Sequence, residues 1–147
     1  MKLAPVIARL TGLASEAASR GGAGVKTVDG VKALAELATV QVALPGLFVV
    51  PAAEDFRPVQ EGAGLIHLET THQFDVVVLI NASATRGRDQ DELMTLADAV
   101  QAQLFGWSPA PEFRPIVPLA SRLLGIDGGR ASWIMRFRTV SHLRKIG

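Results

Sequence analysis

The sequence contains no cysteine, and this absence excludes several kinds of site at once. Disulfide bonds, thiolate metal ligands and cysteine nucleophiles all require that residue. The sequence also lacks an apolar run of the roughly 20 residues that a helix needs to cross a bilayer, so we expect no membrane partner. The apolar run near the N-terminus is broken by Arg9 and followed by Glu16, which argues against a secretory signal peptide.

Catalytic and ligand-binding motifs are also scarce. His67 and His72 lie five residues apart in a region expected to be extended, so their side chains should point to opposite faces, and His142 stands apart from both in the sequence. The glycine-rich segment 21–24 has neither the lysine nor the preceding strand of a phosphate-binding loop. We therefore predict no catalytic residue, no metal site and no cofactor.

Charge is nearly balanced overall but segregated along the chain. The formal net charge is +1, yet residues 61–112 carry eight acidic and two basic residues, and residues 113–147 carry one acidic and seven basic residues. The two segments could neutralise each other across adjacent strands of one subunit, or they could form surfaces that meet between subunits of a ring. Pairing of Arg136 or Arg138 with Glu69 or Asp75 would neutralise the charges within one subunit. Such pairing would also reduce the basic surface that nucleic-acid binding needs.

The segment 65–80 is the most apolar and β-branched part of the chain and predicts one long central strand. Its even-numbered residues are mostly apolar, whereas its odd-numbered residues from His67 to Asp75 are polar and become apolar at Val77 and Leu79. A strand that is apolar on both faces must be covered on both faces. The second cover has to come from a helix or from a neighbouring subunit.

Periodicity and turn residues predict the other elements. Apolar residues at helical spacing predict helices over residues 3–19, from an Asp29 cap through Ala38, and over residues 89–104. Short apolar runs predict strands over 25–28, 47–51, 119–124 and 131–140, the last two joined as a hairpin through Gly125–Gly129. The segments expected to be irregular are the exposed loop 52–63, the turn 81–88, residues 107–118 and a basic tail over 142–145.

This order of elements predicts an α+β fold in which a mainly antiparallel β-sheet packs against two or three α-helices. The length of 147 residues suits a single domain over residues 1–147. The two largest apolar surfaces are the even face of the central strand and the stripe of the helix 89–104. We expect one core that contains Val76, Val78, Ile80, Leu96, Val100 and Leu104.

Taken together, the chain resembles the tail terminator family of long-tailed bacteriophages. The matching segments cover nearly the whole chain: a helix beginning near residues 6–10, the segment from Pro45 through Leu-Phe-Val-Val-Pro-Ala-Ala-Glu, the strand 74–78, a helix 91–104 that ends in Leu-Phe-Gly-Trp-Ser-Pro, and a closing strand with Trp133 and Phe137. The ending of the long helix is the most distinctive of these.

The resemblance implies a non-enzymatic virion protein at the junction of tail and neck, assembled in the host cytoplasm. It would form a homo-hexameric ring on the tail tube protein, stop tube polymerisation and provide a docking surface for the head connector and neck proteins. In sheathed tails it would also meet the sheath protein, and DNA would pass through the ring without sequence-specific binding. The alternatives are another neck or head–tail completion protein of the same particle, or a small ligand-binding or enzymatic α+β domain, which a convergent polar pocket would favour.

We also predict which residues form the assembly interface. Arg86 and Arg88 lie just before a predicted helix start, where positive charge is locally unfavourable, so either the acidic residues of the first turn or another subunit must neutralise them. The loop 82–88 and the loop 52–63 are therefore expected to be assembly surfaces. The full set of interface candidates is Arg86, Arg88, Val77, Leu79, Glu54, Asp55, Arg57, Arg136 and Arg138.

Overall fold

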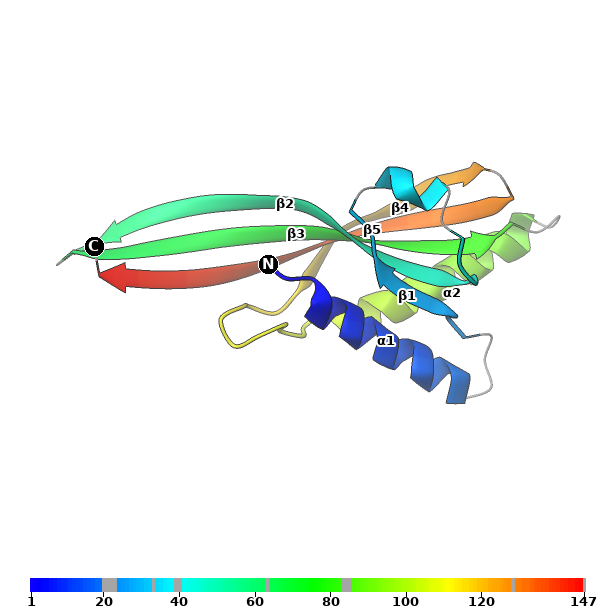
Figure 1. The fold of residues 1–147 in the computed structure, drawn as a ribbon, viewed down its shortest axis with the longest axis horizontal. Coiled ribbons are helices and arrows are strands. Elements are labelled where there is room, and N and C mark those ends of the chain that lie inside the picture. The colour runs from blue at the N-terminus through cyan, green and yellow to red at the C-terminus, as the bar shows by residue number, and fades with distance from the viewer. Residues whose placement is uncertain are drawn as a thin grey trace.

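The computed structural model describes residues 1–19, 24–32, 34–38, 41–62, 64–82, 86–127 and 129–146. Its centre is a five-stranded sheet with the strand order β1-β2-β3-β5-β4. Two α-helices, α1 (Ala4–Ser19) and α2 (Arg86–Leu104), pack on one face of this sheet (Figure 1). We call this face the helix side. The predicted α+β architecture is confirmed.

Three long antiparallel strands form the middle of the sheet: β2 (Gly46–Glu61), β3 (Leu65–Asn81) and β5 (Arg130–Ile146). The edges are the short β1 (Thr27–Gly30), which runs parallel to β2, and β4 (Val117–Asp127), which forms a hairpin with β5. The predicted long central strand and the predicted hairpin are both confirmed. β1 begins two residues later than the sequence indicated.

The main core lies between the helices and the even face of β3. Val76, Val78 and Ile80 are fully buried there with Val100 and Leu104 of α2. Leu96 is partly buried against the same cluster. The predicted core is therefore confirmed, because the helical stripe of α2 and the alternation of β3 are the two surfaces with most apolar area to remove from water.

The second apolar face of β3 is covered by the chain itself. Val77 and Leu79 are buried in a smaller cluster with Leu37 and Leu44, which belong to the segment between β1 and β2. This segment carries one short 3-10 helix, η1 (Leu34–Ala38), in place of the predicted α-helix. Asp29 lies in β1 and does not cap a helix. Because the cover comes from the same chain, the reason for placing Val77 and Leu79 in a subunit interface is removed.

The predicted loop 52–63 is wrong over residues 52–61, which are the end of β2, and the predicted basic tail 142–145 is wrong because it is the end of β5. Residue 63 lies outside the described residues. The β2–β3 register continues from Ala53 opposite Gln73 to Glu61 opposite Leu65, and β5 pairs with β3 as far as Ile146. The charges and Pro58 gave residues 52–61 the composition of a loop. An edge strand tolerates both, because its outer side needs no hydrogen-bonded partner strand.

Together these strand ends form a three-stranded extension that we call the arm, made of residues 52–61, 65–73 and 138–146. In Figure 1 the arm extends beyond both α-helices to one end of the molecule. The predicted irregular segment is confirmed over residues 107–116 and crosses the root of the arm, where the Arg114 amide donates to the Val140 carbonyl over 2.8 Å. No helix in the described part of the chain has the length and hydropathy to cross a membrane.

Candidate assembly surface

The two faces of the arm differ in composition, because directly opposed residues on neighbouring strands share a side of the sheet. The face away from the helices carries most of the charged residues together with exposed Val59, Leu65 and Ile146, and we call it the charged face.

On the helix side, Pro58 of β2 and Leu143 of β5 lie opposite Leu68 of β3, one on each side of it. Phe56 and Ile66 share this side, opposite Thr70 and Gln60 respectively. Phe56 is 62% exposed, Ile66 44% and Leu143 53%. We call Phe56, Pro58, Ile66, Leu68 and Leu143 the apolar arm face.

Cover over the helix side of the arm stops near its root. There His72 is buried beneath Phe113, whose ring meets the imidazole edge-on at a centroid distance of 5.2 Å. Beyond this point Phe56, Ile66 and Leu143 are exposed and Leu68 is half-buried within the described chain. Apolar side chains that gather on one surface, unlike scattered ones, indicate a site of contact with another molecule.

The opposite face of the arm carries several of the predicted interface residues. Asp55 lies opposite Thr71, Arg57 lies opposite Glu69, and Arg138 lies opposite Gln73. Asp55, Arg57 and Arg138 are all exposed. The structure thus brings three candidates onto one face, although two of them come from a segment that the sequence analysis expected to be a loop.

Two histidines also meet on this charged face. His67 Nε2 lies 2.7 Å from His142 Nδ1, and the ring centroids are 4.9 Å apart. His142 is therefore not alone, which sequence spacing could not reveal because the two residues come from different strands. His72 points to the other side, as the spacing predicted. Within the described residues, no three His, Cys, Asp or Glu side chains gather as metal ligands.

Arg136 pairs with Asp75 across β5 and β3 in a two-pronged contact. Its Nε donates to Asp75 Oδ1 over 2.9 Å, and its Nη2 donates to Oδ2 over 3.1 Å. Hydrogen bonding to the Asp75 carboxylate, and then its negative charge, raise the pKa of Arg136. This is one of the pairings that the charge segregation predicted within a subunit. Arg136 is a candidate interface residue that already has a partner in its own chain.

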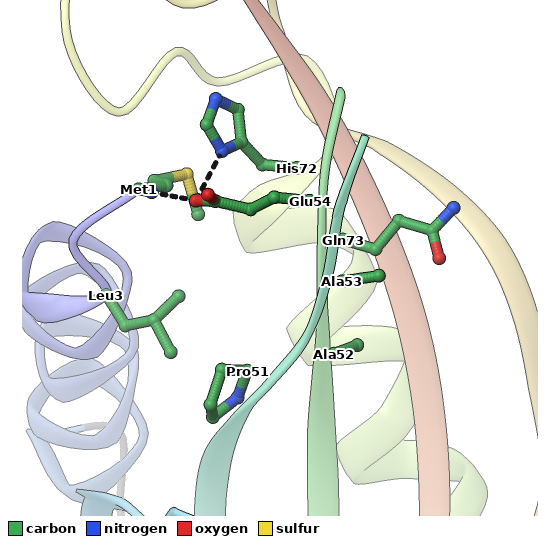
Figure 2. Close-up of a pocket in the computed structure, with 8 residues that line it drawn as sticks. All are labelled: Met1, Leu3, Pro51, Ala52, Ala53, Glu54, His72 and Gln73. Carbon is green, nitrogen blue, oxygen red and sulfur yellow. Dashed lines mark hydrogen bonds and ion pairs between the residues drawn. The ribbon is translucent and has the colours of Figure 1, made fainter. Parts of the chain in front are cut away.

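Glu54 belongs to a polar cluster at the root of the arm (Figure 2). Its carboxylate accepts from the Met1 amino group and lies 3.0 Å from His72 Nδ1, while His72 Nε2 lies 2.7 Å from the Ser141 hydroxyl. The hydrogen bond from the amino group is the largest cause that lowers the pKa of Glu54, followed by the one from His72. The cluster links the start of α1 to the arm.

A hollow of about 370 Å³ adjoins this cluster and is lined by Met1, Leu3, residues 51–54, His72 and Gln73. Two of its polar residues, Glu54 and His72, are hydrogen-bonded to each other and to the Met1 amino group or Ser141. The side chain of Gln73 points away from them in Figure 2. This arrangement can hold the arm against α1. It does not present a nucleophile with a base, or the convergent polar groups that a ligand pocket needs.

Arg86 and Arg88 lie away from the candidates on the arm. α2 begins at Arg86, three residues earlier than predicted, so both arginines belong to its first turn. Arg88 is exposed, and the neighbouring Asp89 is buried. In Figure 1 the start of α2 lies at the end of the molecule opposite the arm. The candidates at the start of α2 are therefore separated from those on the arm, while Arg136, Val77 and Leu79 lie between the two ends of the sheet.

The apolar arm face is not among the surfaces predicted from the sequence. Ile66 and Leu68 were recognised as part of the even face of the central strand, but their neighbours Phe56 and Leu143 were assigned to a loop and a tail. The sequence did contain one signal for this face. Thr139, Ser141 and Leu143 occupy every second position and so continue the strand alternation of β5 beyond residue 138.

Comparisons with known proteins identify a family and a similar fold. A family model described as "Phage tail terminator protein" matches residues 3–147. Among solved structures, the chain is similar to one from the "Virion of native gene transfer agent (GTA) particle", with 18% sequence identity, a TM-score of 0.53, and coverage of 94% of this chain and 92% of that one. At this identity the likeness concerns the fold. No curated protein matches the sequence.

Proposed function

Because the chain belongs to the phage tail terminator family, we propose that it closes the tail tube as a homo-hexameric ring and stops the tube from growing. The family match over residues 3–147 carries this proposal. It gives the chain a structural role in tail completion. The ring, the block to polymerisation and the position at the tail–neck junction are the finer parts of the proposal.

The form of the chain suits a protein that acts by assembly. One end of the sheet is an arm whose helix side exposes Phe56, Ile66 and Leu143, while its other side exposes charged residues. A single small domain gains nothing in its own stability from apolar side chains that remain in water. They would be buried when neighbouring subunits are in place.

The partners follow from this role. The tail tube protein would contact one rim of the ring, and the head connector or another neck protein would contact the other rim. In a sheathed tail, the last ring of sheath protein would lie beside it. DNA would cross the lumen without base-specific contacts, and the complex would be completed in the host cytoplasm before it becomes part of the virion.

The test is to add the purified protein to tail tube protein that is polymerising, and to measure tube lengths by negative-stain electron microscopy. We expect tubes to stop growing and to carry a ring-shaped density at one end. A small folded protein without a role in tails serves as the control for crowding. Tubes that reach the same lengths with and without the protein would contradict the proposal.

A further inference from the structure

A second exposed apolar surface lies at the other end of the sheet, on β4. Leu123 is 49% exposed and Ile126 is 58% exposed. The register places Leu123 opposite Trp133 and Ile126 opposite Ala131, and both partners pack on the main core. Leu123 and Ile126 therefore share the helix side with half-buried Trp133. We call these three residues the β4 strip.

The apolar arm face and the β4 strip cannot meet within one chain, because they lie at opposite ends of the long axis of the molecule (Figure 1). They are also not equivalent, since each is built from different residues. Contact between two different surfaces of identical chains is head-to-tail, and head-to-tail contacts close into rings when the rotation between subunits permits it.

The twist of the sheet points these two surfaces in opposite directions. At the arm end of Figure 1 the strands run β2, β3, β5 from top to bottom, whereas at the opposite end β5 lies above β3 and β2 lies below it. The helix side therefore turns over between the two ends. Two copies in similar orientation can then place the arm of one over the β4 strip of the next, which a flat sheet would not allow.

The edges of the sheet favour contact through faces over continuation of the sheet between subunits. The outer edge of β2 contains Pro51 and Pro58, and the β2–β3 register shifts between Pro51 and Ala53. The β4–β5 register shifts twice, between Pro118 and Ala120 and between Leu123 and Gly125. Prolines and register irregularities are devices that prevent strands from pairing edge to edge.

We propose that the apolar arm face of each subunit packs on the β4 strip of the next copy of this chain around the ring. The inference rests on the proposed ring and adds the surfaces that close it. Phe56, Ile66 and Leu143 would supply one side of the contact. Leu123, Ile126 and the exposed part of Trp133 would supply the other. The charged face of the arm remains open to a different partner.

Disulfide trapping tests this contact cleanly, because the native chain has no cysteine. A Leu143→Cys, Leu123→Cys double variant is bound to tail tubes, oxidised mildly and separated without reductant. We expect a ladder of covalent oligomers up to the closed ring. A mixture of the two single variants should give dimers, and either single variant alone should give none. The matched control combines Leu123→Cys with Val59→Cys, which is 37% exposed on the opposite face of the arm, and should not cross-link.

A charge rescue gives a second readout with variants that keep the fold. Leu143→Glu should reduce tube capping at least tenfold, while the melting temperature stays within about 2 °C, as expected for an exposed position. Adding Leu123→Lys should restore capping, because each glutamate would then face a lysine of the next subunit.

The outcomes separate the two proposals. If the wild-type protein caps tubes but positions 143 and 123 neither cross-link nor rescue each other, the contact is wrong and the terminator role survives. Loss of capping by Leu143→Glu without rescue would also overturn the contact and indicate that the arm meets the tube protein. If the wild-type protein does not shorten tubes, the proposed function fails. Trapping of the concentrated free protein then decides on the contact alone, and the absence of 143–123 dimers there would refute it.

Discussion

Replacement of Arg136 with methionine should lower the free energy of unfolding by about 2 kcal/mol. The variant loses two hydrogen bonds, of 2.9 and 3.1 Å, to Asp75 and leaves a carboxylate that is only 3% exposed without its cationic partner. A hydrogen bond to a charged group contributes about 1.5–3 kcal/mol. The Arg136 side chain is 46% exposed, so solvent screens the pair, and the total should lie near the lower end of that range.

The assay is thermal unfolding at pH 7, followed by circular dichroism. A loss of about 2 kcal/mol in a domain of this size corresponds to a fall in melting temperature of about 4–8 °C. Arg138→Met is the matched control, because Arg138 lies two residues along the same strand, on the same face, opposite the uncharged Gln73. It should change the melting temperature by about 2 °C or less.

A double variant separates the pair from the packing around it. Asp75→Asn combined with Arg136→Met removes the buried charge together with its partner, and should recover part of the loss, because the unpaired carboxylate causes most of the cost. If Arg136→Met is no less stable than Arg138→Met, the pair contributes nothing to the fold. Charge pairing between the acidic and basic segments within one subunit would then not stabilise the fold.

Three further predictions concern the core, the root of the arm and the far end of the sheet. Val78→Asp should prevent soluble expression, because an unpaired buried carboxylate costs several kcal/mol, whereas Val59→Asp on the exposed arm should express normally. The pKa of Glu54 is lowered in the folded protein, so its contribution to stability is present above the unfolded pKa of about 4.3 and is lost as pH falls through the folded pKa. Melting temperatures of wild type and Glu54→Gln should therefore differ at pH 7 and converge in acid, and a constant difference would contradict this linkage. Arg86→Ala with Arg88→Ala should leave the melting temperature within about 2–4 °C and reduce binding to tail tubes in a pelleting assay, and unchanged binding would show that the arginines only solvate the helix start.

The sequence predicted the parts of the fold in which local pattern and burial agree. The helical stripe of α2 and the alternation of β3 are strong periodic signals, and the structure buries Val78, Val100 and Leu104 together. The charge segregation also indicated the contact between Arg136 and Asp75. In each case the contact was predictable from the apolar or charged character of the residues that make it.

The arm could not be predicted in the same way, because its strands are stabilised by their neighbours. Residues 52–61 contain charges and Pro58, which local propensity assigns to a loop, yet pairing with β3 makes them a strand. The segment that buries Val77 on the second face of β3 could not be predicted either, because η1 is too short to give a periodic signal. The meeting of His67 with His142 depends on register between strands that are far apart in the sequence.

The candidate interface was predicted in part for the same reason. Exposed charges were recognised by type, and the structure places Asp55, Arg57 and Arg138 on one face of the arm. The exposed apolar residues of the arm were missed, because an apolar side chain in a strand is normally interpreted as core. Only the three-dimensional structure shows that Leu143 and Ile66 remain exposed within the described chain.

The terminator role is tested most directly by the length of tails made in the absence of this protein. Tails isolated from a particle that lacks the gene would be measured by electron microscopy beside tails from the complete particle. The proposed role predicts tubes of variable and excessive length without a closing ring, and restoration of uniform length when the wild-type chain is supplied. Tubes of normal, uniform length in the absence of the protein would contradict it.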